Sequence, residues 1–191
     1  MQIIKSKKDI DTQIGAEIME YPSLLNELTH HGPNKIVTFT GRYIDPCNPD
    51  PSAIHILDIA HALSNVCRFG GHCPSFYSVA EHSVMVADFM ERDGHRGHTL
   101  LAGLLHDSEE AYLMDIPSPI KRQFPEYADT GTRLRHAIYD SFGIDFELYN
   151  HVKPFDSEVY KFERHHLWHG APTLYPKAAK ELFLKRFHEY S

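Results

Sequence analysis

Residues 104–119, LLHDSEEAYLMDIPSP, place one histidine among four carboxylates directly after an apolar run. His106 and Asp107 are adjacent, and a neutral imidazole nitrogen beside an ionised carboxylate suits Zn, Co, Mn or Fe. Two protein ligands are too few for a metal site, so this chemistry requires further ligands elsewhere in the chain. Without them, His106 is a hydrogen-bonded histidine at the edge of the core and Asp107 is a solvated acid.

A helical wheel divides the acids of this segment into different roles. If residues 98–113 form one helix that is stopped before Pro117, each residue advances by about 100° around the axis. His106, Asp107 and Glu110 then share a polar arc that borders the apolar face. Glu109 lies apart from them, as an ordinary acid of the exposed face.

Two other residues have suitable types for the missing ligands, His82 and Asp156, each near the predicted start of another helix. The sequence Ser78-Val-Ala-Glu81 is a capping box, in which Ser78 accepts a hydrogen bond from the Glu81 N–H while Glu81 reaches back. It places His82 in the first turn of its helix.

The elements that must position these residues are mostly helices. Helices are predicted from residue 56 to near residue 68, from residue 79, over 98–113, after Ser118-Pro119, and over about 127–142, 154–168 and 176–189. Residues 36–40 are β-branched and aromatic and predict at most a short strand or hairpin. Residues 9–30 predict a weakly amphipathic helix, followed by a Gly-Pro linker.

Composition indicates a globular chain with an acidic balance. Its 191 residues favour one domain, and a net charge of −7 without a basic run argues against long nucleic acid as a partner. A small anionic substrate stays compatible, because a metal or local cations can attract it. The cysteines, Cys47, Cys67 and Cys73, lack CxxC spacing, and no signal or membrane segment is visible, so reduced thiols and a cytoplasmic location are expected. Fifteen histidines favour metal or proton chemistry.

Four stretches together resemble the HD-domain metal-dependent phosphohydrolases, and more closely the small 5'-deoxynucleotidases and the phage dATP triphosphohydrolases of that family. They are DIAHALSNVCRFGGH (58–72), FYSVAEHSVMVA (76–87), LLHDSEEAYLMDIPSPIKR (104–122) and VKPFDSEVYKFERH (152–165). The resemblance covers roughly residues 38–170. It implies an all-α fold, with a single HD-domain helical bundle over residues 36–191 and an N-terminal extension over residues 1–35.

The resemblance also implies a metal site. His82, His106, Asp107 and Asp156 would hold one divalent ion (Co, Zn, Mn or Mg), and further metals can arrive with the phosphates. Five or six coordination would leave room for water or a phosphate oxygen. Such an ion supplies a nucleophile at neutral pH, so the expected reaction is in-line attack at the phosphorus attached to O5'.

Two acids gain catalytic roles through the resemblance. Glu110 matches the family's catalytic glutamate, which orients or deprotonates the attacking water. Asp115 matches a second functional aspartate that could protonate the leaving 5' oxygen. On the plainer interpretation, Glu110 is an exposed helix acid and Asp115 a partner for the next loop.

Four residues gain substrate-binding roles in the same way. Arg68 matches an arginine that clamps phosphate, and Lys121 matches a phosphate-facing lysine. Phe69 and Pro119 stand where the base would be held by stacking, which is tolerant of base identity. The plainer interpretation makes the two cations solvated surface groups and the other two core residues.

The predicted helix over 154–168 carries two further patterns. Glu163 and Arg164 match a family pair and predict a structural ion pair. The HHxxH sequence of residues 165–169 lacks the glutamate of HExxH, so no metal site is expected there.

The expected function is therefore a metal-dependent phosphohydrolase for deoxynucleotides, with dATP or another dNTP as the first substrate candidate. A 5'-deoxynucleotidase acting on dNMPs shares the same residues and is the close alternative. A cyclic-nucleotide or alarmone hydrolase would share the metal ligands, and a non-catalytic metal-binding or nucleotide-sensing module is the alternative of another class. A homo-oligomer, dimer or hexamer, is expected from the resemblance alone.

Overall fold

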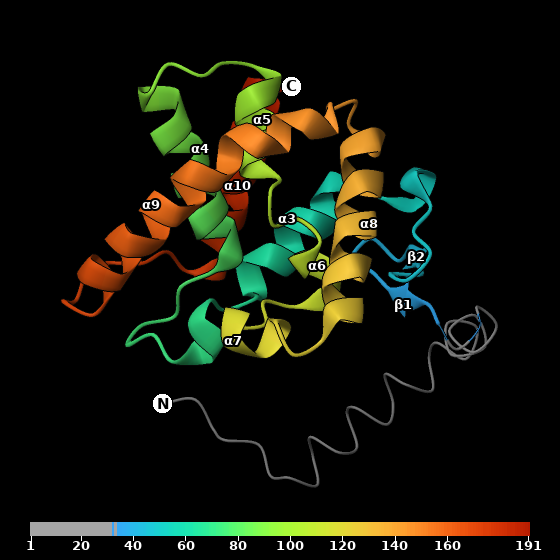
Figure 1. The fold of residues 1–191 in the computed structure, drawn as a ribbon, viewed down its shortest axis with the longest axis horizontal. Helices are drawn as coiled ribbons and strands as arrows, with labels where there is room; N and C mark the ends of the chain where they lie inside the picture. The colour runs from blue at the N-terminus through green and yellow to red at the C-terminus, as the bar shows by residue number, and fades with distance from the viewer. Residues whose placement is uncertain (1–31, 33) are drawn as a thin grey trace, which may run out of the picture.

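The computed structural model describes residue 32 and residues 34–191, and this part of the chain is mostly helical (Figure 1). The predicted helix over residues 9–30 and nearly all of the predicted 1–35 extension lie outside the described residues. The described α-helices are α3 (Ile56–Asn65), α4 (Val79–Arg92), α5 (His98–Leu104), α6 (Glu110–Leu113), α7 (Ser118–Lys121), α8 (Pro125–Ser141), α9 (Tyr149–Leu167) and α10 (Pro176–Tyr190). Short 3₁₀ turns lie at η1 (Pro51–Ala53), η2 (Phe69–Gly71) and η3 (Phe146–Leu148). The all-α prediction is confirmed.

One small hairpin precedes the helices. Strand β1 (Ile36–Val37) pairs antiparallel with β2 (Tyr43–Ile44), which confirms the predicted hairpin. It is tied to α3 because the buried Asp58 carboxylate accepts hydrogen bonds from Thr40, at 2.6 Å from the backbone N–H and at 2.9 Å from the hydroxyl. The hairpin therefore closes one end of the helical body.

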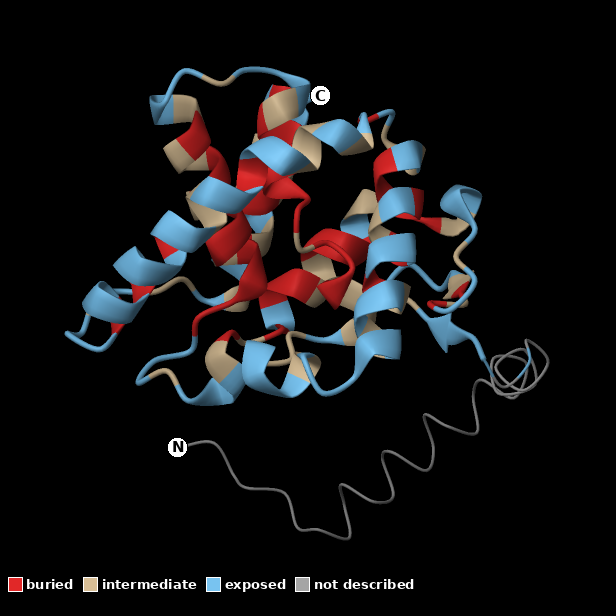
Figure 2. Ribbon diagram, in the orientation of Figure 1, coloured by how far each residue is buried: buried red, intermediate tan, exposed pale blue. Residues whose placement is uncertain are grey.

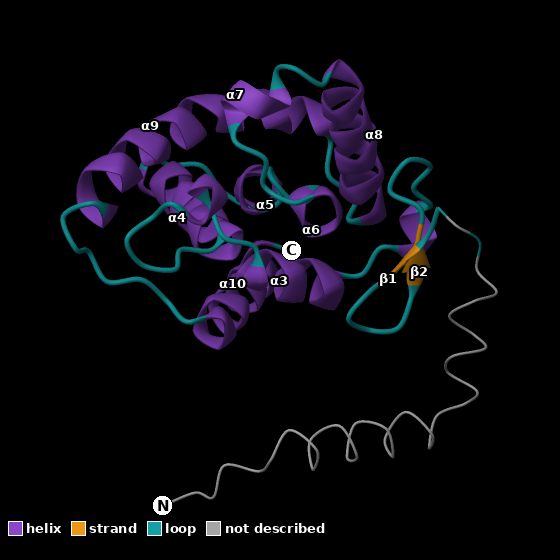
Figure 3. Cartoon of the chain, turned by 90° about the horizontal axis from the view of Figure 1, so that it is seen from below, coloured by secondary structure: helices purple, strands orange, loops and turns teal. Residues whose placement is uncertain are grey.

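The core lies where α4 crosses between α3, α5 and α10, and Figure 2 shows this crossing as the most deeply buried region. Figure 3 shows α3 and α10 side by side on one side of it. Helix α5 approaches α4 closely at Gly103, where an added Cβ would lie 2.5 Å from the Sδ of the buried Met90. A glycine is therefore what lets the segment after α5 come near α4.

Helix α9 differs from its prediction at one end. It begins at Tyr149, not at Pro154, and carries the proline inside it. The sequence suggested a start at Pro154 because proline favours the first turn of a helix. An interior proline removes one helical hydrogen bond and crowds the carbonyl one turn before it, and the long helix accommodates this cost. The result positions Asp156 inside a helix and not at its beginning.

Candidate metal centre

His82 lies in the first turn of α4 and is fully buried. The start of α4 is held by Ser78, whose side chain accepts a hydrogen bond from the Glu81 N–H at 3.1 Å, as predicted. The predicted return contact of Glu81 to the start of the helix is wrong, because the Glu81 carboxylate accepts a hydrogen bond from the Leu174 N–H. The cap therefore determines where His82 enters the core, while Glu81 holds the segment before α10.

The predicted continuous helix over 98–113 is wrong at its centre. Helix α5 ends at Leu104 and α6 begins at Glu110, and the residues between them form a tight turn. His106 Nδ1 donates to the Gly103 carbonyl oxygen at 2.8 Å, and in an unbroken helix that oxygen would accept the Asp107 N–H. The imidazole competes with the backbone for this acceptor, so the wheel does not apply beyond Leu104.

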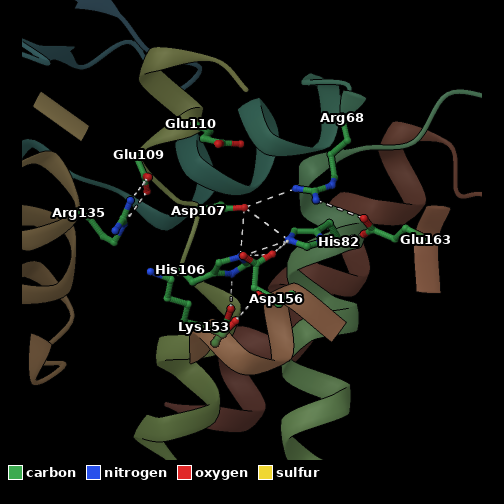
Figure 4. Close-up of polar contacts among 12 residues, drawn as sticks. Arg68, His82, His106, Asp107, Glu109, Glu110, Arg135, Lys153, Asp156 and Glu163 are labelled. Atoms are coloured by element: carbon green, nitrogen blue, oxygen red, sulfur yellow. Dashed lines mark hydrogen bonds and ion pairs between the residues drawn. The ribbon is translucent and has the colours of Figure 1, made fainter. Parts of the chain in front are cut away.

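The turn and two helices bring the four candidate ligands together (Figure 4). Asp107 Oδ2 lies 3.1 Å from His106 Nε2 and 3.5 Å from His82 Nε2. Asp156 Oδ1, from α9, lies 3.2 Å from His82 Nε2 and 3.8 Å from His106 Nε2. His82, His106 and Asp107 form a group that could hold a metal ion, with ligand atoms within 4.8 Å of one another.

Both imidazoles have their outer nitrogen anchored. His82 Nδ1 lies 2.6 Å from Glu163 Oε1, and His106 Nδ1 donates to the Gly103 carbonyl. In a neutral imidazole a proton on Nδ1 leaves the Nε2 lone pair free, and here the two Nε2 atoms lie only 3.2 Å apart. Lone pairs and carboxylate oxygens facing one another require a positive charge among them. A divalent cation fits this donor set, because ligating histidines characteristically donate their other N–H to a carboxylate or carbonyl.

The electrostatics of the same atoms favour positive charge. Burial and Arg68 lower the pKa of His82, but Glu163, Asp107 and Asp156 outweigh them and raise it to about 10. Burial also opposes charge on His106, yet the two aspartates raise its pKa to about 9. Burial raises the pKa of Asp107, but the two histidines dominate and hold it well below its usual range. Protons and a metal ion therefore compete for the same histidine nitrogens and aspartate oxygens.

Arg68 is buried, which contradicts the interpretation of a solvated surface cation. Its Nη2 lies 3.2 Å from Glu163 Oε2 and its Nη1 lies 3.6 Å from Asp107 Oδ2. Glu163 also accepts from the Tyr77 hydroxyl at 2.8 Å. One buried carboxylate thus orients both Arg68 and His82.

The predicted ion pair between Glu163 and Arg164 is wrong. Glu163 is buried, whereas Arg164 is exposed with its guanidinium 5.8 Å from the Trp168 ring centre. Neighbouring residues on a helix point about 100° apart, so one faces the site while the other faces solvent. The sequence interpretation named Glu163 but missed its role at the candidate metal centre. Its position two turns after Asp156 on the same helix was the available signal.

Glu110 begins α6 and is buried, so it is not an exposed helix acid. Lys121 Nζ lies 3.2 Å from its Oε1, while its Oε2 is buried without a hydrogen-bond partner among the described residues. Burial, helped by the neighbouring carboxylates and opposed by Lys121, raises the pKa of Glu110 well above its ordinary value. Burial also raises the pKa of Asp115, against the opposing effect of Arg68. Both acids therefore retain protons to higher pH than usual.

A cavity of about 460 Å³ opens at these groups, within the size range of small-molecule sites. The predicted site residues that line it are Arg68, Phe69, Asp107, Glu110, Asp115, Pro119, Lys121 and Asp156. His82 and His106 lie behind them, buried in the floor. The structure therefore brings every predicted site residue to one place.

Phe69 forms part of the cavity wall and is not a core residue. Its backbone has φ of 58°, a conformation that is strained for a bulky side chain and is found preferentially at functional sites. Its ring centre lies 5.1 Å from that of Trp168 and 6.0 Å from that of Tyr160. Tyr160 also lines the cavity, and the sequence interpretation missed it, although it follows Asp156 by one helical turn.

Glu109 is not an exposed acid either. It is buried and forms two hydrogen bonds with Arg135 of α8, one of them from Nε at 3.0 Å. The histidines of residues 165–169 are exposed, and among the described residues no second group of potential metal ligands is present. The expectation of no metal site there stays a prediction.

The three cysteines are free thiols. No helix among the described residues is both long and apolar enough to span a membrane.

Fold and site together define a mostly helical protein with a His-His-Asp group, able to hold a metal ion, at the floor of a cavity. No family model matches the chain. It is 34% identical over 176 residues to the uncharacterized protein YfdR of Escherichia coli K12, covering 82% of this chain and 95% of that one. The chain therefore belongs to the same family as YfdR. It is also 38% identical over 110 residues to the uncharacterized protein RCAP_rcc00048 of Rhodobacter capsulatus, covering 55% of this chain and 56% of that one.

Proposed function

We propose that this protein is a metal-dependent phosphohydrolase of the HD type that cleaves the 5' phosphate ester of deoxynucleotides. The observation that supports it most directly is the pair of buried imidazoles, anchored at Nδ1 and facing each other at 3.2 Å through Nε2. Structural zinc sites are closed, whereas this group borders a cavity large enough for a nucleotide. His82, His106 and Asp107 are the proposed ligands, with Asp156 as the fourth.

When bound, a divalent cation supplies Lewis acidity toward a phosphoryl group and makes water more acidic. Glu110 orients the attacking water and takes its proton, and burial raises its pKa in the direction that makes it a stronger base. Asp115 is the proton donor to the leaving O5', and burial raises its pKa in the direction that favours the acid form. Arg68 and Lys121 bind the phosphate oxygens from the cavity wall.

The first substrate candidate is a deoxynucleoside triphosphate such as dATP. One observation supports the alternative, a 5'-deoxynucleotidase acting on dNMPs. Two of the cations that line the cavity, Arg68 and Lys121, already pair with carboxylates, and the third, Lys161, has no ion-pair partner among the described residues. A triphosphate therefore needs additional cations, brought with its phosphates, to balance its charge.

The test is a product count. Protein purified without oxygen is loaded separately with Co, Mn, Zn or Mg and offered dNMPs and dNTPs, and phosphate, pyrophosphate and triphosphate are quantified. Triphosphate released from dNTPs supports the leading proposal, and turnover of dNMPs alone supports the alternative. If no metal permits turnover of either class, the proposed activity is wrong.

Glu110→Gln separates a hydrolase from a non-catalytic sensor. A hydrolase would lose turnover by about 10²- to 10⁴-fold while it keeps its metal. A nucleotide-sensing module would bind nucleotide and metal as before and would show no turnover in either form.

A further inference from the structure

One face of α8 contacts the segment of residues 102–114, which carries the candidate ligands His106 and Asp107. Tyr127, Gly131, Arg135 and Tyr139 are spaced four residues apart and therefore lie on one side of the helix. In Figures 1 and 3 this helix runs beside α6. The contacts are polar and fall before, within and after the turn of residues 105–109.

The contacts at the two ends involve backbone carbonyl groups. Before the turn, the Tyr139 hydroxyl donates to the buried Ala102 carbonyl at 2.7 Å. After it, the Tyr127 hydroxyl lies 2.7 Å from the carbonyl oxygens of both Leu113 and Met114. Each hydroxyl satisfies an acceptor near an end of the short helices that flank the turn, where helical partners run out.

The central contact is the strongest by type. Arg135 donates from Nε and Nη2 to the two oxygens of Glu109, the geometry in which an arginine fork matches a carboxylate (Figure 4). Its guanidinium also lies 4.4 Å from the ring centre of Tyr149, at the start of the helix that carries Asp156. Glu109, which stands between Asp107 and Glu110 in the sequence, therefore points toward α8 and away from the histidines.

Gly131 lets the two segments approach. An added Cβ there would lie 3.6 Å from Glu109 Cγ, so the backbone of α8 is already close to the turn. Short backbone hydrogen bonds hold the turn locally, among them Ser108 N–H to the Leu105 carbonyl and Glu110 N–H to the Asp107 carbonyl, but no continuous α-helix joins α5 to α6. The side-chain contacts from α8 add to these local bonds and tie the turn to a long helix.

We propose that Arg135 and Glu109 are positioning residues, and that the α8 face of Tyr127, Arg135 and Tyr139 acts as a splint that sets the geometry of His106, Asp107 and Glu110. This inference rests on the proposed function for the meaning of that geometry. The contacts with α8 fix the direction of the Asp107 and Glu110 carboxylates and keep the Glu109 carboxylate from competing for the cation.

The test uses two variants that avoid leaving a buried charge alone. Arg135→Lys keeps the charge and loses the fork, and the double variant Glu109→Gln with Arg135→Gln removes both charges and keeps hydrogen-bonding groups. The matched control is Arg133→Gln, an exposed arginine on the same helix whose hydrogen bond is to Thr130. Full-length protein is used throughout.

Two readouts are independent of turnover. In metal-free protein, hydrogen exchange of the amides of residues 105–110 should be faster by about tenfold or more in both Arg135 variants and unchanged in the control. With Co²⁺, the dissociation constant, measured against a chelator, should rise by about 10- to 100-fold, and the visible absorption spectrum should change.

The possible results are distinct. Unchanged exchange together with an unchanged Co²⁺ spectrum in folded Arg135 variants overturns the inference. If exchange is faster in the Arg135 variants but the wild type binds no Co²⁺, the positioning role of α8 is confirmed and the metal site of the proposed function is wrong. If the Arg135 variants do not fold, Tyr127→Phe, which loses one hydroxyl group, is subjected to the same two measurements with the same criteria.

Discussion

Replacing Glu163 by glutamine tests whether one buried carboxylate organises the candidate metal centre. The carboxylate is fully buried and contacts Arg68 Nη2 at 3.2 Å, His82 Nδ1 at 2.6 Å and the Tyr77 hydroxyl at 2.8 Å. Glutamine has nearly the same shape and keeps hydrogen-bonding groups, so the substitution removes mainly the charge. Arg68 is then left buried with Asp107 as its remaining ion-pair partner among the described residues.

The magnitude follows from the burial. Removing one partner of a buried ion pair costs about 3–5 kcal/mol, and the retained hydrogen bonds put this case near the lower end, about 3 kcal/mol. For a chain of this length about 1 kcal/mol lowers Tm by about 2–4 °C, so Tm should fall by about 6–12 °C. Metal affinity should weaken by about 10- to 100-fold, because a neutral acceptor replaces the charged one that orients His82 and makes its ring a stronger ligand.

The effect on stability also has a predicted pH dependence. Burial raises the pKa of Glu163, but His82, Arg68 and Tyr77 outweigh it, so the pKa lies below its ordinary value of 4.5. A depressed carboxyl pKa stabilises the fold above the unfolded-state value, and this contribution is lost as pH falls through the folded-state value. The difference in Tm between wild type and Glu163→Gln should therefore be largest near pH 7 and should become smaller below about pH 4.5.

The assay is thermal unfolding across this pH range, combined with calorimetric Co²⁺ titration of chelator-treated protein. Glu158→Gln is the matched control, since Glu158 is an exposed glutamate of the same helix, and it should leave both quantities unchanged. A Glu163→Gln protein that melts within about 2 °C of wild type and binds Co²⁺ equally well would refute the reasoning.

Three further predictions concern other parts of the site. Lys121→Met should move the acidic limb of the kcat/KM profile to higher pH, because Lys121 opposes the raised pKa of Glu110, and a limb that stays in place would show that Glu110 is not the titrating base. Zinc affinity should rise about tenfold or more per pH unit between pH 6 and 8, since each bound ion displaces at least one proton from the two site histidines. Titration calorimetry in buffers of different ionisation enthalpy would count the released protons, and a count of zero contradicts the prediction. Gly103→Ala should destabilise the fold by about 1–3 kcal/mol in chemical unfolding, because its Cβ would lie 2.5 Å from Met90 Sδ, and an unchanged midpoint would mean that Met90 moves aside without cost.

The sequence by itself determined the local features of this protein. Apolar residues at helical spacing predict α3, α4, α8 and α10, and the Ser78 cap places His82 correctly in the first turn of α4. These signals are local, because helix periodicity and capping depend on residues within about one turn of each other. The residue types suited to metal binding were likewise visible in His82, His106, Asp107 and Asp156.

Only the tertiary structure decided how those residues meet. The helix breaks after α5, where the His106 ring donates to the Gly103 carbonyl, a contact that residue spacing does not reveal. Glu163 meets His82 and Arg68 across separations of 81 and 95 residues, and Glu109 meets Arg135 across 26. Such pairs depend on which helix faces meet after folding. For that reason a glutamate expected to brace its neighbour, and an acid expected to face solvent, both lie buried and hold the candidate metal centre in place.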